Sequence, residues 1–271
     1  MCVSRLPVGI FVLTFAAVVA RSQTAPMFQH TENGAAYSIA GHNPAQGGTT
    51  RIPVIIIPIA LQFASHAGER LDATSTVPAL LQSPLFVPFP FPGQASTQYV
   101  DGMLRASFPH PDNWHTLLTK SDVLGEVTIQ VPPEAGYLLT SKQGGKLGIA
   151  DIAFIQRELF KQLPKHPGTL LLAVTNNTAY YVEGDATICC TWGTHGSDEA
   201  TGNSFVLASY LNNAPAIVQD RDVQPLTEQI AEFVNDPLHD PLAPVAKGDP
   251  AGNKVPRWLR PVSMHPGDQG P

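Results

Sequence analysis

Hydrophobic and polar positions follow two different periods along this chain, and these periods predict where strands and helices lie. Runs rich in β-branched and other apolar residues are typical of strands. Such runs predict strands over residues 52–63, 126–131, 169–175 and 204–211. Pro53 and Pro58 cannot donate a hydrogen bond to a neighbouring strand, so we expect the first of these strands to lie at a sheet edge or to contain a break.

Apolar residues spaced three or four positions apart predict amphipathic helices. We expect a short helix within residues 77–86 and longer helices over 97–108, 149–163 and 224–235. Pro164 is expected to end the third of these helices. Asn176 and Asn177 predict a turn, after which residues 180–183 are expected to form a hairpin with the strand that precedes the turn.

The order of these elements predicts the fold class and the limits of the domain. Strands and helices alternate, but hairpin-like neighbours also occur. We therefore expect one domain of the mixed α/β class with a mixed sheet, and an α+β arrangement stays open. The domain is predicted over residues 51–236. Residues 23–50 lack a clear period and are expected to form an irregular arm, while residues 237–271 contain eight prolines and are expected to form a tail without regular structure.

The first 22 residues have the pattern of a secretory signal peptide. Arg5 supplies positive charge, residues 7–20 form an apolar run, and Ala20-Arg21-Ser22 fits a small-x-small cleavage site. The run is shorter than a comfortable membrane span, which needs about 20 apolar residues. We expect a secreted or periplasmic protein with no membrane span after removal of the signal. Retention of the segment as an N-terminal anchor is the alternative.

The composition excludes some functions and limits disulfide pairing. Apolar residues make up 43% of the chain, which is enough for a sizeable core. A net charge of −6 without a run of Lys or Arg argues against nucleic acid as a partner. Once the signal is removed, Cys189 and Cys190 are the remaining cysteines, so no disulfide can join distant segments of one chain. We expect these two either to pair with each other or to remain reduced.

The helix predicted over 224–235 carries the clearest candidate chemistry. Its apolar residues share one side, and Glu228 and Glu232 are four positions apart on the other side, where their carboxylates are neighbours. Zinc peptidases use this spacing for two metal ligands, with the catalytic base directly after the first ligand. Gln229 occupies the base position here, and an amide cannot take a proton from metal-bound water. A solvated amphipathic helix is the alternative.

Histidines near this helix are the candidates for further metal ligands. His195 precedes the strand that leads to the helix, and His239 follows the helix. In the longer zinc-peptidase pattern the third ligand comes ten residues after the first, which is Leu238 here, one position before His239. Carboxylates without imidazole suit hard cations better than zinc. Zinc is thus not the only metal that fits. We expect zinc or another divalent cation, held by Glu228, Glu232 and His239, unless His239 is an ordinary loop residue.

Several blocks support a family resemblance. They are residues 83–86, 97–101 and 231–237, Cys189-Cys190 followed by His195, and Val255-Pro256-x-Trp258. With these blocks the chain resembles a family of uncharacterised exported bacterial proteins that have a zincin-like metallopeptidase signature. In that family the helix carries the pattern S-H-E-x-x-E-x-x-x-D-P, where the His and the second Glu would bind zinc and the first Glu would activate water. The matching positions of this chain are Glu228, Glu232 and Gln229, so the resemblance implies a zincin-like helix whose catalytic residues are replaced.

Three functions stay open at this point. The first is an exported metallopeptidase-like protein without catalysis, which keeps a cleft for a peptide or protein ligand. The second is an extracellular or periplasmic binding module with no metal site. The third is an active hydrolase with an unrecognised site, although the chain contains no G-x-S-x-G, phosphate-loop or G-x-G-x-x-G motif.

Overall fold

The structure is a computed structural model that describes most of the chain between residues 27 and 237. The described ranges are 27–32, 35–65, 69–93, 95–108, 110–182, 184–198, 200–212, 218, 220–235 and 237. The predicted signal peptide, nearly all of the predicted tail and His239 lie outside them. Within the described residues, no helix combines the length and the apolar character needed to cross a membrane.

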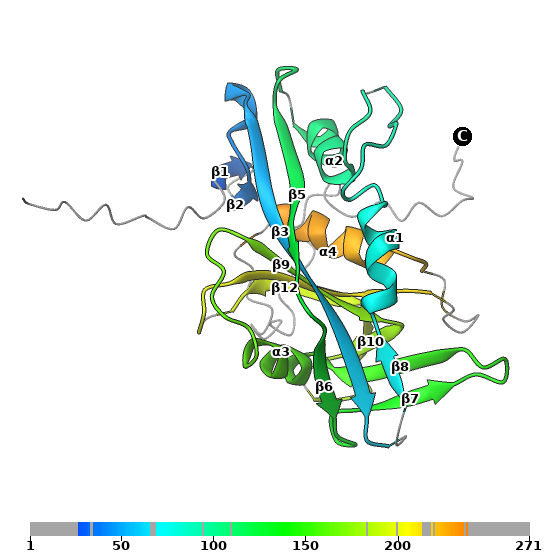
Figure 1. The fold of residues 1–271 in the computed structure, drawn as a ribbon. Helices are drawn as coiled ribbons and strands as arrows, with labels where there is room; N and C mark the ends of the chain where they lie inside the picture. Colours follow the sequence, from blue (N-terminus) through cyan, green and yellow to red (C-terminus); the bar gives the residue numbers. More distant parts are fainter. Residues whose placement is uncertain are drawn as a thin grey trace, which may run out of the picture.

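A mixed sheet forms the centre of the molecule, and it confirms the mixed α/β class (Figure 1). Its strands are β3 (Thr49–Phe63), β4 (Arg70–Asp72), β5 (His115–Val123), β6 (Val127–Val131), β9 (Leu170–Asn176), β12 (Gly193–Ser197) and β13 (Ser204–Tyr210). The order is β12-β13-β9-β3-β4, and β5 and β6 also pair with β3. β3 pairs parallel with β5, β6 and β9, and β13 pairs parallel with β9. β4 pairs antiparallel with β3, and β12 pairs antiparallel with β13.

Two prolines lie inside β3, yet the strand is central and continuous, which differs from the expected edge or break. Its partners account for this. The pairing with β9 begins at Val54, one residue after Pro53. On the other side, the pairing with β5 ends at Ile56 and that with β6 begins at Ile59, so Pro58 falls in the gap between the two. Each proline therefore lies where β3 has a partner on one side only, a place where a residue without an N–H group is tolerated.

A second, four-stranded sheet has the order β11-β10-β8-β7. Its strands are β7 (Gly136–Thr140), β8 (Lys146–Asp151), β10 (Thr178–Tyr181) and β11 (Cys189–Thr191). The expected hairpin between residues 169–175 and 180–183 is wrong, because β10 pairs with β8 and β11 rather than with β9. Asn177 has a φ of 46°, and this single left-handed residue turns the chain from one sheet into the other instead of reversing it.

Four α-helices flank the sheets in the described chain: α1 (Val77–Leu81), α2 (Tyr99–Ser107), α3 (Ile152–Phe160) and α4 (Gln224–Asn235). The predicted helix over 149–163 begins too early, because Ile149 and Ala150 belong to β8. Asp151 marks the true start of α3, since its side chain accepts hydrogen bonds from the backbone N–H groups of Ala153 and Phe154. The helix predicted over 224–235 has the expected bounds.

The core lies on both faces of the main sheet. Ile52, Val54 and Ile56 of β3 pack with buried residues of α1, α2 and α4. The alternate β3 residues, among them Ile55 and Ile57, pack with α3 and with the second sheet. This explains why β3 has a continuous apolar run, since both of its faces are covered.

The segment before β3 is regular, so the prediction of an irregular arm over 23–50 is wrong for the residues described. β1 (Met27–Glu32) and β2 (Ala35–Ala40) form an antiparallel pair, and a 3₁₀ turn follows over Pro44–Gln46. Ile39 is fully buried against the core that includes α4. Ala40 is buried in the same core and Phe28 packs against it, but small and polar residues separate these contacts, which left too weak a period to recognise.

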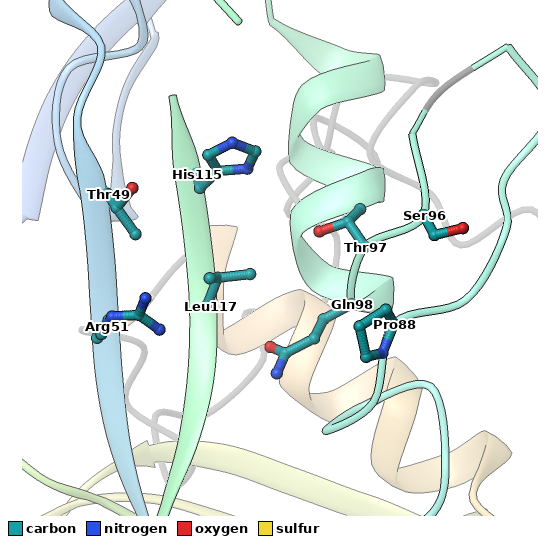
Figure 2. A pocket seen from close by; sticks show the side chains of 8 residues that line it. All are labelled: Thr49, Arg51, Pro88, Ser96, Thr97, Gln98, His115 and Leu117. Carbon is teal, nitrogen blue, oxygen red and sulfur yellow. The ribbon is translucent and has the colours of Figure 1, made fainter. Parts of the chain in front are cut away.

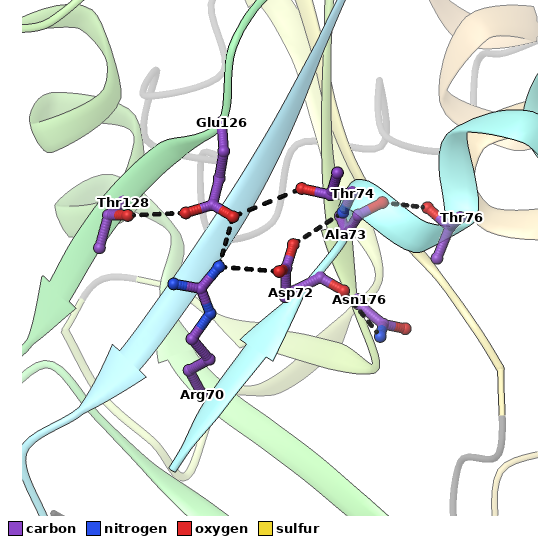
Figure 3. Close-up of polar contacts among 8 residues, drawn as sticks. All are labelled: Arg70, Asp72, Ala73, Thr74, Thr76, Glu126, Thr128 and Asn176. Carbon is purple, nitrogen blue, oxygen red and sulfur yellow. Dashed lines mark hydrogen bonds and ion pairs between the residues drawn. The ribbon is translucent and has the colours of Figure 1, made fainter. Parts of the chain in front are cut away.

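A polar cluster joins β4 to the start of β6 (Figure 3). Arg70 Nη2 donates to Asp72 Oδ2 at 2.7 Å and also to Glu126. The hydroxyl of Thr128 donates to Glu126 Oε1 at 2.9 Å, and the backbone N–H of Thr74 donates to Asp72 Oδ1 at 2.8 Å. Burial by itself would raise the pKa of Asp72, but the hydrogen bonds from Arg70 and Thr74 hold it below its ordinary value.

Candidate functional site

The polar face of α4 is the site predicted from the sequence. Leu226, Ile230 and Val234 are fully buried, and they fix the helix against β12, β13 and α2. Glu228 and Glu232 lie on the partly exposed side of the helix, as the period predicted.

Gln229 is buried, which the helical period did not indicate, and it faces β12. Its Oε1 lies 3.3 Å from Nδ1 of His195, and Oε2 of Glu232 lies 3.5 Å from the same nitrogen. An amide oxygen and a carboxylate both accept, so these contacts are hydrogen bonds when Nδ1 of His195 carries the hydrogen. The residue at the expected base position thus takes part in a contact that joins α4 to the sheet.

The carboxyl group of Glu228 interacts with Glu232, Asp220 and Tyr99. Burial, then the neighbouring Glu232, then Asp220 raise the pKa of Glu228 above its ordinary value. Tyr99 of α2 lies close enough for Glu228 to contribute to a raised pKa of its hydroxyl, after burial. Glu228 therefore lies near Tyr99 of α2 and near Asp220, while Glu232 lies beside His195.

The structure brings part of the predicted metal site together. Among the described residues, no three or more His, Cys, Asp or Glu side chains gather in an arrangement that could hold a metal ion. His195 lies beside Glu232 but does not form such a group with Glu228. His239, the third predicted ligand, is outside the described residues.

Of the two alternatives for the cysteines, the structure has the pair joined as a vicinal disulfide between Cys189 and Cys190. The two residues begin β11 and are exposed. They lie on the second sheet, where β11 pairs with β10.

A second candidate site, which the sequence did not indicate, is a pocket of about 340 Å³ beside the start of α2 (Figure 2). Two strands and one loop region form it: β3 provides Thr49 and Arg51, β5 provides His115 and Leu117, and residues 96–98 with Pro88 provide the opposite wall. In the parallel register Thr49 lies beside His115 and Arg51 beside Leu117. These four side chains share one face, while Thr50, Ile52, Thr116 and Leu118 are buried on the other.

The segment that begins α2 closes the edge of β5 with side chains instead of a strand. Gln98 accepts the backbone N–H of Leu118 at 2.7 Å and donates to the carbonyl of Leu118 at 2.9 Å. Asp101 accepts the N–H of Thr116 at 2.8 Å. These bonds hold the wall of the pocket at a fixed distance from β5.

Asp101 also positions His115. The Asp101 side chain has no exposed surface, and its Oδ2 lies 3.0 Å from Nδ1 of His115, whose side chain is 33% exposed. The hydroxyl of Thr97 donates to the same oxygen at 2.6 Å. Because Asp101 binds Nδ1, Nε2 is the ring nitrogen of His115 that remains for a ligand.

Sequence reasoning missed this pocket for a definite reason. Asp101 lies in a helix that was predicted, but the strand that carries His115 was not. Only the first half of β5 alternates between buried and partly exposed residues, and its second half, from Thr119 to Asp122, is exposed and polar. An alternating pattern over four residues is too short to identify a strand.

Comparisons of the chain with protein-family models, with curated proteins and with solved structures found no match. The family resemblance therefore stays a prediction.

Proposed function

We propose that this protein is an exported, non-catalytic binding protein, in which α4 has the ligand spacing of a metallopeptidase helix but not its chemistry. The observation that carries this proposal is the 3.3 Å contact between Gln229 Oε1 and His195 Nδ1. A metallopeptidase needs a base at this position to take a proton from metal-bound water. Gln229 has no such capacity and binds the sheet instead.

The electrostatics of α4 bear on metal binding in two opposite ways. A carboxylate must be ionised to bind a metal, and the raised pKa of Glu228 means that the folded protein opposes its ionisation. A bound cation would relieve the repulsion between Glu228, Glu232 and Asp220. The proposal therefore requires a direct measurement of metal binding.

Isothermal titration calorimetry with zinc, together with a peptide-cleavage assay, tests the proposal. We expect the protein to cleave no peptide in the presence of zinc, since loss of general-base catalysis alone costs about 10²–10⁴-fold in rate. Zinc-dependent cleavage by the unaltered chain, abolished by a chelator, would refute the proposal.

A double change shows whether α4 derives from a peptidase. Glu228→His with Gln229→Glu places an imidazole and a carboxylate at the metallopeptidase positions. The control is Thr119→His with Lys120→Glu, which adds the same side chains on an exposed part of β5. Zinc affinity that rises in the first variant and not in the control supports a peptidase-like frame. Equal, negligible binding in both means that α4 is an ordinary amphipathic helix, as in the binding module without a metal site.

A further inference from the structure

We propose that the pocket between β3, β5 and the start of α2 binds the carboxylate of a small organic ligand, such as the C-terminal residue of a peptide. This inference rests on the proposed binding function and names the ligand class for it. In this pocket an arginine, a histidine, hydroxyl groups and an apolar wall meet.

The charge of the pocket is opposite to that of the whole protein. The chain has a net charge of −6, yet the ionisable side chains that line the pocket are Arg51 and His115, without a carboxylate among the lining residues. Arg51 is exposed, and no described residue forms a hydrogen bond or ion pair with its guanidinium. Asp101, which contacts the lining residues His115 and Thr97, is buried, and its oxygens already accept bonds from Thr97, His115 and Thr116.

The geometry of the donors suits an oxyanion. The planar guanidinium of Arg51 offers two parallel N–H groups, the arrangement that binds a carboxylate with two hydrogen bonds. In Figure 2, Arg51 and His115 project from neighbouring strands on the same side of the pocket, and Ser96 and Thr97 lie opposite. Thr97 is committed to Asp101, so Thr49 and Ser96 are the hydroxyl groups that remain as additional donors.

The size and the walls of the pocket limit the ligand. The pocket is a small surface depression of about 340 Å³ that is open to solvent, so it can hold only one end of a ligand. Pro88 and Leu117 add an apolar wall beside the donors. The site therefore suits a carboxylate that carries one apolar group, which is the chemistry of a peptide end, better than a bare inorganic anion.

Pre-organisation strengthens the case for binding. His115 is held by the buried Asp101, and the opposite wall is held by the two hydrogen bonds between Gln98 and Leu118. The ring of His115 and the opposite wall are therefore already in place for a ligand, which lowers the entropic cost of binding. The guanidinium of Arg51 has no such support and becomes ordered when the ligand binds.

Calorimetry with three probes tests the inference: N-acetyl-leucinate, the neutral N-acetyl-leucinamide and inorganic phosphate. We expect the carboxylate to bind measurably and the amide to bind at least tenfold more weakly. Arg51→Gln should weaken binding of the carboxylate by roughly ten- to hundredfold, because a hydrogen bond to a charged group is worth about 1.5–3 kcal/mol. The matched control is Lys120→Gln, which removes an exposed charge of β5 outside the pocket and should leave the affinity unchanged.

The outcomes separate this inference from the proposed function. Equal affinity for the acid and the amide, equal effects of Arg51→Gln and Lys120→Gln, or binding of phosphate without binding of N-acetyl-leucinate would each overturn it. Circular dichroism of Arg51→Gln shows that the variant is folded. A protein that binds N-acetyl-leucinate through Arg51 and also cleaves peptides with zinc would keep the pocket and refute only the non-catalytic proposal.

Discussion

Replacement of Asp101 by Ala should destabilise the protein by about 3 kcal/mol. The buried N–H of Thr116 loses its acceptor, and an unsatisfied buried donor costs about 1–3 kcal/mol. The hydroxyl of Thr97 and the ring of His115 are partly exposed and can turn to water, so each lost bond costs about 0.5–1 kcal/mol. Together these losses amount to about 2–5 kcal/mol of unfolding free energy. Removal of a buried carboxylate also removes the cost of its dehydration, which lowers the expected loss to about 3 kcal/mol.

Asp101→Asn should cost less, about 1–2 kcal/mol, and so provides a graded test. The amide oxygen of the new asparagine can still accept the N–H of Thr116. Its amide nitrogen, however, faces the hydroxyl of Thr97 and Nδ1 of His115, which both contacted the carboxylate, and it cannot accept from them. The control is Asp112→Ala, because Asp112 is exposed and no described residue bonds its carboxylate.

Urea unfolding followed by tryptophan fluorescence measures these differences, since the fully buried Trp114 lies next to His115 in the chain. The expected order of destabilisation is Asp101→Ala, then Asp101→Asn, then Asp112→Ala with nearly no effect. If Asp101→Ala lies within about 1 kcal/mol of Asp112→Ala, the reasoning is refuted, because that is less than a single unsatisfied buried donor typically costs.

Three further predictions concern charge and covalent links. Because the pKa of Glu228 is raised in the folded state, its ionisation costs stability above its unfolded pKa. Glu228→Gln should therefore raise the free energy of unfolding by at least about a few tenths of a kcal/mol at pH 7 and leave it unchanged near pH 3. An equal gain at both pH values would contradict this. The pKa of Asp72 is lowered, so its contribution is present above its unfolded pKa and disappears as the pH falls through the folded one; urea midpoints of Asp72→Asn should therefore fall less between pH 6 and pH 3 than those of the parent protein. The vicinal disulfide joins residues one position apart and constrains almost no unfolded chain, so a reductant should barely lower the melting temperature, whereas a loss near the 2–4 kcal/mol typical of long-loop disulfides would show that this reasoning fails.

The apolar pattern was a good guide wherever one period covered a whole element. The run over 52–63 and the amphipathic period over 224–235 predicted β3 and α4, because burial on two faces and burial on one face leave different signatures. The pattern failed where two elements share one apolar run. Residues 149–163 mix the end of β8 with α3, and Asp151 was the N-cap signal that would have separated them.

The two candidate sites differ in what the sequence could predict. Glu228 and Glu232 are local neighbours on one helix, so their proximity follows from spacing alone. The contact of Gln229 with His195 joins residues 34 positions apart, and that of Asp101 with His115 depends on the register of β5 against β3. Such pairs are set by tertiary packing, which no local pattern contains.

The side-chain closure of β5 has a consequence for the behaviour of the protein at high concentration. Among the described strands, β5 pairs with β3 alone, so its outer edge could accept a strand from another molecule. Gln98 and Asp101 occupy the first part of that edge, while Lys120 and Asp122 place charges along the exposed remainder. The same groups that hold the pocket wall thus also oppose intermolecular β-pairing, so their loss would expose an aggregation-prone edge.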